Sequence, residues 1–445
     1  MKKEEMKQLC LDTIEANREK IIALGKAIYR TPELGYKEFR TMETLTKAIR
    51  ELGIEPKTGI AYTGCAVSTG EKGKGRRVAV IGELDCIACA AHPDANELGN
   101  IHACGHNIQI ANVYAVMLGL MTSGIASQLS GAIDFISIPA EECVDYEYRK
   151  GLIREGKIRF MGGKQEYFSR GGFDDVDMVL QCHMMEQEKG KRCIINTKGN
   201  GFCTKVVRFI GKASHAGFAP EQGINALNMA ELAMNNMHAL RETFRDEDKV
   251  RVSMIIKKGG ELVNVVPAEV TAEIMVRAFS IESMLDASHK VNRAMKAAAM
   301  ALGGKVEIDD GIGYLPLSTD KKLSAFYMDN MMQYGGAAKD DMVWEMETAG
   351  STDLGDISQM KPCMHVWTEG ITGGLHSEEY RIADEDKAYL QPARMMALQV
   401  IDLLYGKGEA AEEVMKDFHP AFDKESYLKL MEEHKKIDCY DASML

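Results

Sequence analysis

Short apolar runs that end in polar residues alternate with helical segments along much of this chain. Residues 78–84, 131–138, 178–182 and 363–367 read as buried strands. Helical patterns lie between them, near residues 108–122 and 320–335. This alternation predicts an α/β fold with a mostly parallel sheet and helices on both faces.

The stretch from 198 to 311 follows a different order. We read strands at 203–211, 251–257, 261–266, 269–277 and 304–309, and helices at 223–245 and 281–302. The order matches the β-α-β-β-α-β arrangement of a compact ferredoxin-like α+β unit. A chain of 445 residues is also long enough for two domains. We therefore expect a larger domain, 1–197 and 312–445 with a helical tail, that is interrupted by a smaller one.

Bulk properties narrow the class of partner. The net charge of −12 argues against nucleic acid or an anionic membrane as the main partner. No run approaches the roughly 18 apolar residues of a membrane span. The eleven cysteines are scattered, and the N-terminal residues carry charges where a signal peptide needs an apolar core. These features predict a cytoplasmic protein with reduced thiols.

Metal-competent side chains occur in several separate segments. They are His102-Ala103-Cys104-Gly105-His106, Pro139-Ala140-Glu141-Glu142, His183, Ser214-His215-Ala216-Gly217 and Gly373-Gly374-Leu375-His376. An isolated histidine is most often structural, and adjacent glutamates are most often solvated. All but the histidine of 214–217 fall at apparent strand ends, where open α/β sheets bind ligands. A thiolate and an imidazole two residues apart can face one metal ion. Two adjacent carboxylates can divide metal binding and proton transfer between them.

The order of these segments resembles the M20 metallopeptidase family, and most closely its aminoacylase-like amidohydrolase branch. That branch includes hippurate, indole-acetyl-amino-acid and aminobenzoyl-glutamate hydrolases. The resemblance runs from Tyr29–Gly35 to Gly374–Glu378 and includes 211–216, 264–267 and 351–353. His-Ala-Cys-Gly-His followed by Pro-Ala-Glu-Glu is its most specific part.

The resemblance implies a two-metal centre and its chemistry. Its ligands would be Cys104, which bridges the ions, with His106, Glu142, His183 and His376. The implied reaction is hydrolysis of the amide bond of a small N-acyl amino acid or related amide. A metal-bridged water would attack, and Glu141 would act as general base and acid. Two divalent ions per subunit are expected, and Zn, Mn, Co and Ni all tolerate such ligands.

The same resemblance implies that 198–311 is a lid and dimerisation domain, so the protein is expected to be a homodimer. His215 would reach the partner subunit's active site and stabilise the oxyanion. Asn264 and Arg277 would hold the carboxylate or amide of the substrate. A structural asparagine in a turn and a surface arginine are the competing interpretations of these two residues.

The chain departs from the family pattern near the expected metals. Glu83 stands where the family commonly has Asp, and Asn107 and Gln109 stand where it commonly has Asp-x-His. We expect Asn107 and Gln109 to lie behind the metal ligands as their polar partners. The segment 143–175 is longer than usual and rich in Tyr and Arg. It either lines or covers the pocket, or is a surface insertion.

Three other functions compete with this one. A dipeptidase or an aminobenzoyl-glutamate-type hydrolase would use the same chemistry on another substrate. A binding protein without turnover would keep the fold, and only the changes at 107 and 109 favour it. A cysteine hydrolase that uses Cys104 and His106 leaves both glutamates, His183 and His376 unexplained.

Overall fold

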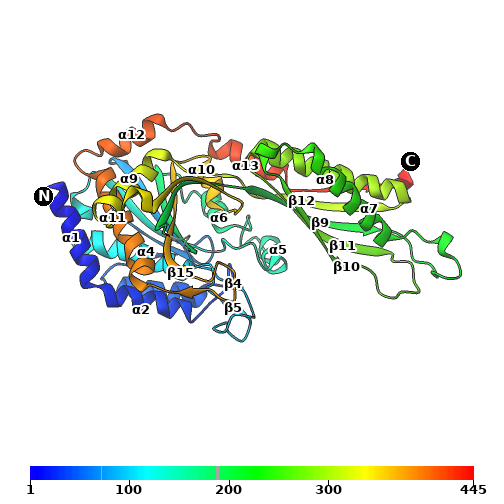
Figure 1. Cartoon of the computed structure of the whole chain (residues 1–445), viewed down its shortest axis with the longest axis horizontal. Coiled ribbons are helices and arrows are strands. Elements are labelled where there is room, and N and C mark those ends of the chain that lie inside the picture. Colours follow the sequence, from blue (N-terminus) through cyan, green and yellow to red (C-terminus); the bar gives the residue numbers. More distant parts are fainter. Residues whose placement is uncertain (72, 187–189, 445) are drawn as a thin grey trace. The chain divides into compact units, whose positions relative to one another are not determined.

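The computed structural model describes residues 1–71, 73–186 and 190–444 (Figure 1). Its residues group into two compact units. The first unit comprises Met1–Lys198, Ser318–Glu347 and Asp356–Ala421. The second comprises Gly199–Leu317, Thr348–Gly355 and Phe422–Leu445.

The larger sheet has ten strands within the described residues, and its main path runs β1-β2-β6-β3-β7-β15-β8-β13. The strands are β1 (Lys57–Ile60), β2 (Gly64–Ser68), β3 (Arg76–Glu83), β6 (Gly131–Ile138), β7 (Met178–Glu186), β8 (Cys193–Gly199), β13 (Leu317–Ser318), β14 (Met342–Thr348), β15 (Cys363–Thr372) and β16 (Arg381–Ile382). The central strands β6, β3, β7 and β15 run parallel. They are nearly continuous apolar runs because both faces of the sheet are buried.

Ten helices in the part of the chain that the structure describes accompany this sheet, and several of them bury the faces of the sheet. They are α1 (Lys3–Ala16), α2 (Arg18–Tyr29), α3 (Phe39–Arg50), α4 (His106–Met121), α5 (Tyr146–Arg154), α6 (Gly163–Ser169), α9 (Lys321–Gln333), α10 (Leu354–Ser358), α11 (Gln391–Leu404) and α12 (Glu409–Asp417). All lie in the first unit, except that α10 begins at the end of a second-unit segment. Helix α4 is apolar on all sides, and it packs on β3 and against α1, α2 and α11. A helix surrounded in this way is a fixed support for the residues at its N-terminus.

The second unit is a five-stranded antiparallel sheet with the order β10-β11-β9-β12-β17. Its elements are β9 (Gly201–Ile210), α7 (Ala226–Ala239), β10 (Arg251–Lys258), β11 (Glu269–Ala278), α8 (Ile281–Leu302), β12 (Lys305–Tyr314), α13 (Lys424–Glu433) and β17 (Lys436–Asp441). The side chains of Asn225 and Ser280 accept backbone hydrogen bonds and begin α7 and α8. The order from β9 to β12 is the β-α-β-β-α-β arrangement of a ferredoxin-like unit.

The predicted fold class is confirmed: a mixed α/β protein with a mostly parallel central sheet and a second α+β unit within the chain. The strand predicted at 261–266 was wrong, because these residues form a bend, a turn and one isolated bridge at Val265 between β10 and β11. The tail also differs from the prediction. Residues 436–441 form a strand that pairs with β12, so 422–445 group with the second unit and not with the rest of 312–445. The predicted domain limits at 198 and 311 stay predictions.

None of the helices in the described part of the chain combines the length and the apolar character that a membrane crossing requires.

Candidate metal centre

The predicted ligands come from separate segments of the first unit, around the carboxyl ends of its central strands. Glu142 follows β6, and His183 lies in the last part of β7. His376 lies in the loop after β15, and Cys104 and His106 lie at the start of α4. The carboxyl ends of parallel strands meet at one edge of a sheet, which brings these segments together.

Unusual backbone conformations aim two of these segments. Gly105 has φ +81°, and a Cβ there would lie 3.1 Å from Cγ of Met184, so a glycine suits the turn that leads into α4. Ala140 and His376 have φ +57° and +58° without being glycine. The N–H of Ala140 donates to the buried carboxyl of Glu38 at 2.8 Å, which helps to hold this conformation. Strained residues of this kind concentrate at functional sites.

The donor atoms of the five predicted ligands fall into two overlapping groups. Cys104, His106 and His183 form one group, and Cys104, Glu142 and His376 form the other; within each group the ligand atoms lie within 4.8 Å of one another. Cys104 Sγ lies 3.5 Å from His183 Nε2, and Glu142 Oε1 lies 3.0 Å from His376 Nε2. All five predicted ligands are therefore brought together, and Cys104 belongs to both groups.

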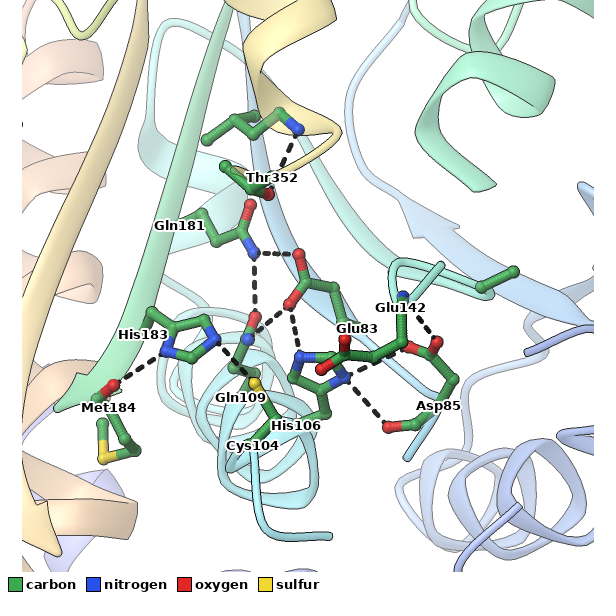
Figure 2. A network of polar contacts seen from close by, with 12 residues as sticks. Glu83, Asp85, Cys104, His106, Gln109, Glu142, Gln181, His183, Met184 and Thr352 are labelled. Carbon is green, nitrogen blue, oxygen red and sulfur yellow. Dashed lines mark hydrogen bonds and ion pairs between the residues drawn. The ribbon is translucent and has the colours of Figure 1, made fainter. Parts of the chain in front are cut away.

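The hydrogen bonds leave the correct nitrogen of each buried histidine for a metal. His183 Nδ1 donates to the carbonyl of Met184 at 2.8 Å, which leaves the lone pair of Nε2 facing Cys104. His106 Nδ1 donates to the carbonyl and to Oδ1 of Asp85, at 2.9 and 3.1 Å (Figure 2). Asp85 Oδ2 also accepts from the backbone N–H of Glu142 at 2.9 Å. One carboxylate thus orients two ligand segments, as is common at metal sites.

One buried atom of the donor groups, His106 Nε2, has no hydrogen bond from the described residues. Buried polar atoms are rarely left without a partner, and a bound ion can supply the partner that such atoms need. The donor set of thiolate, imidazole and carboxylate is that of a transition-metal site. The residues present therefore fit divalent metal ions.

Burial and neighbouring charges decide which of the proposed ligands carry a proton when no metal is bound. Burial raises the pKa of the Cys104 thiol well above its usual value, and a coordinating cation removes that proton. Burial lowers the pKa of His183 to about 4, so this ligand is neutral near pH 7. For His106, the negative charges and hydrogen bonds of Cys104, Glu83 and Asp85 outweigh the lowering effect of burial. The pKa of His106 therefore lies well above its usual value. Protons and metal ions therefore compete for His106.

The two glutamates after β6 occupy different surroundings. Both are buried, but Glu142 joins Cys104 and His376, whereas Glu141 joins Glu83 and His106 in a third donor group. Burial raises the pKa of Glu142, but the hydrogen bond and charge of His376 oppose burial and bring the pKa below its usual value. Glu142 is therefore a carboxylate beside the donors, as a ligand must be.

The expectation for Asn107 was wrong, whereas Gln109 does contact a residue of the site. Asn107 donates to the carbonyl of Gly25 and to the hydroxyl of Tyr389, each at 3.2 Å, and so it faces away from the ligands. Gln109 donates to Oε2 of Glu83 at 2.6 Å. Successive residues of a helix point about 100° apart, whereas i and i+3 share a face, so Gln109 and not Asn107 lies on the side of His106.

The segment after Glu142 is not a loose surface insertion. It forms α5 and α6 and sends two cationic side chains into the protein, Arg149 and Lys164, both almost fully buried. Arg149 donates to the carbonyls of Glu142 and Met161. Lys164 Nζ lies 2.5 Å from Oε1 of Glu83. Sequence reasoning treats Arg149 only as part of the insertion and misses Lys164, because burial is the only signal for either.

The second unit holds the other predicted residues. His215 forms an isolated β-bridge with Val265, and the carbonyl of Asn264 accepts from the N–H of Ala216 at 3.0 Å. His215 Nδ1 accepts from the backbone N–H groups of Gly217 and Phe218 at 3.2 and 3.0 Å. A neutral His215 therefore carries its proton on Nε2. Arg277 lies on β11, where it donates to Oγ of Ser351 at 3.0 Å.

The chain is similar in sequence to known peptidases and amidohydrolases. Residues 198–302 match the M20 peptidase dimerisation domain. The chain is 27% identical over 441 residues to a Xaa-Arg dipeptidase of Mus musculus, and the match covers 95% of this chain and 94% of that protein. It is 26% identical over 328 residues to an N-acyl-L-amino acid amidohydrolase of Geobacillus stearothermophilus. This match covers 71% of this chain and 81% of that protein.

A solved structure shares the fold. A dinuclear metal binding peptidase of the M20 family from Bacillus subtilis superposes with a TM-score of 0.64 at 17% identity, covering 88% of this chain and 99% of that one. Residues 198–302 thus match an M20 dimerisation domain, and the chain as a whole is similar to a dipeptidase and an amidohydrolase. The resemblance seen in the sequence is confirmed, and the protein is a metal-dependent hydrolase of amide bonds, with donor groups that fit divalent metal ions.

Proposed function

We propose that this protein hydrolyses the amide bond of small N-acyl amino acids with two divalent ions held in the first unit. The single observation that carries the proposal is the pair of donor groups that share Cys104. His106 and His183 complete one group, and Glu142 and His376 complete the other. Ions held in this way supply Lewis acidity, which acidifies water and polarises the scissile carbonyl.

Glu141 is the proposed general base and acid. It is 8% exposed, lies in a donor group with His106, and sits beside the proposed ligand Glu142. A carboxylate in this place can take a proton from water and deliver it to the leaving nitrogen.

Residues of the second unit are proposed to complete the site in a homodimer. His215 is exposed, and the two backbone donors on its Nδ1 leave Nε2–H as the donor for an oxyanion. Asn264 and Arg277 are proposed to hold the amide or the carboxylate of the substrate, since an arginine fork suits a carboxylate. The match of 198–302 to a peptidase dimerisation domain supports the homodimer.

A dipeptide is the second candidate substrate. The Xaa-Arg dipeptidase of Mus musculus matches over nearly the whole length of both chains, whereas the amidohydrolase matches over 71% of this one. A panel of N-acyl amino acids, Xaa-Arg dipeptides and aminobenzoyl-glutamate, with products identified by mass spectrometry, decides between them. Zinc or manganese is the proposed metal. A cytoplasmic location is proposed too, since all eleven cysteines are free thiols.

The roles of the two glutamates are tested by a matched pair of variants. Glu141→Gln keeps the shape and removes the proton carrier, so turnover should fall by roughly 10²-fold or more while the bound metal stays. Glu142→Gln should lower metal content instead. The proposal fails if these effects are exchanged. Wild-type protein that holds its metal and hydrolyses no member of the panel would favour a binding protein without turnover.

A further inference from the structure

Glu83, the last residue of β3, stands at the centre of a buried polar cluster beneath His106. Its side chain is 1% exposed and is surrounded by Lys164, Gln109 and Gln181, which are equally buried. Figure 2 shows this carboxylate between His106 on one side and the two glutamines on the other. The ligand set proposed above does not use it.

The hydrogen bonds of Glu83 are unequally shared between its two oxygens. Oε1 accepts from Lys164 Nζ at 2.5 Å and from Gln181 Nε2 at 2.7 Å, which uses both of its lone pairs. Within the part of the chain that the structure describes, Oε2 accepts only from Gln109 Nε2, at 2.6 Å. One lone pair of Oε2 is therefore left on the side of His106.

The free side of Oε2 faces an atom that also needs a partner. His106 Nε2 lies 3.1 Å from Oε2 of Glu83. The two atoms are not aligned as a hydrogen bond, and no other described residue bonds to this nitrogen. Two ligand atoms that each lie about 2.1 Å from one ion are about 3.0 to 3.4 Å apart at ordinary ligand angles. The distance between Nε2 and Oε2 lies within this range.

We propose that Glu83 is a carboxylate ligand of the metal ion at His106, and that Lys164 holds it in the ligating orientation. This inference rests on the proposed two-metal function and adds a sixth protein ligand to it. Lys164 comes from the segment after Glu142, so that segment supports the metal centre from within the protein. The Glu83–Lys164 pair is neutral as a whole, which lets an additional carboxylate bind without adding net charge to the buried site.

The test is the affinity for Co²⁺ alone, measured by competition with a chromophoric chelator. Wild-type protein should bind two ions, and Glu83→Gln should weaken one of them by at least about 10- to 100-fold, the loss typical of residues that only orient a ligand. Asp402→Asn is the matched control, since Asp402 forms a buried pair with Lys7, at 2.7 Å, in the same unit. This variant should bind both ions as wild-type protein does.

A double variant separates ligation from simple charge compensation and serves if Glu83→Gln alone does not fold. Glu83→Gln with Lys164→Met removes both charges of the pair. If Glu83 is a ligand, affinity for one ion stays weakened in the double variant. Wild-type affinity in the double variant, or in Glu83→Gln itself, overturns the inference. Wild-type protein that binds fewer than two ions contradicts the proposed two-metal function instead.

Discussion

Replacing Lys164 with methionine tests whether the segment after Glu142 is part of the structural support of the site. The Lys164 side chain is fully buried, and its ammonium pairs with the carboxylate of Glu83 at 2.5 Å. The charge of Lys164 also opposes the effect of burial on Glu83: burial raises the pKa of that carboxyl, but Lys164, His106 and His183 bring it below its usual value. Methionine keeps the length of the side chain but removes the cation, so Glu83 becomes a buried anion without its main counter-charge.

The size of the effect follows from these contacts. Breaking a buried ion pair by removing one partner costs about 3–5 kcal/mol. Gln109 and Gln181 still donate to Glu83, so a loss near 3 kcal/mol is expected. Urea unfolding of the metal-free protein, in the presence of a chelator, measures the loss as a lower midpoint at unchanged slope. The control is Lys157→Met in the same segment, whose side chain is 49% exposed and should leave the midpoint unchanged.

Two results would refute the reasoning. One is a Lys164→Met protein as stable as wild type, which would mean that Glu83 needs no counter-charge. The other is a Lys157→Met protein that loses as much stability as the Lys164→Met protein does. Adding Glu83→Gln to Lys164→Met should recover part of the stability, because the unpaired anion is then gone as well.

Two further predictions concern the surroundings of the ligands. Burial and the charge of Asp85 raise the pKa of Glu38 from 4.5 to about 8. The protonated carboxyl of Glu38 therefore adds to the free energy of unfolding below pH 4.5, and this contribution is lost as the pH rises through about 8. Glu38→Gln should remove this part of the pH dependence, which amounts to a few kcal/mol in the free energy of unfolding. Urea unfolding of the metal-free protein, in the presence of a chelator, measures it from about pH 5 to about pH 9. A variant whose stability depends on pH as that of wild type does would contradict the prediction. Asn107→Asp should set an anionic oxygen against the carbonyl of Gly25, lower stability by about 1–3 kcal/mol and leave metal content unchanged. Tighter metal binding in Asn107→Asp would show that the residue faces the ligands after all.

The sequence predicted the central strands well because their signal is local. Residues 131–138 form a strand with the predicted limits, and 78–84 differs by one or two residues at each end. A continuous apolar run between polar residues identifies a doubly buried strand without knowledge of its neighbours. Residues 436–441 could not be recognised in this way. They are half exposed and mixed in polarity, and only their pairing with β12 makes them a strand.

The candidate ligands could be predicted because their order along the chain resembles a known pattern, but their supporting residues could not. Lys164 lies in the sequence Gly-Lys-Gln-Glu-Tyr-Phe, which reads as an ordinary polar helix, and nothing in it shows that the lysine is buried. Asn107 was misplaced for the opposite reason. It is adjacent to His106 in sequence, but the rotation of α4 turns it toward Gly25 and Tyr389. Proximity along a helix indicates proximity in space only when the helical period is taken into account.

Cys104 is proposed to serve two metal ions at once, and counting the bound metal tests this proposal most directly. Protein equilibrated with buffered Zn²⁺ and analysed for metal should hold two ions per chain, because Cys104 belongs to both donor groups. Cys104→Ser should weaken both ions, whereas His183→Ala and His376→Ala should each weaken one. Cys89→Ala, outside these groups, should leave both in place. Two tightly held ions in Cys104→Ser would contradict the account.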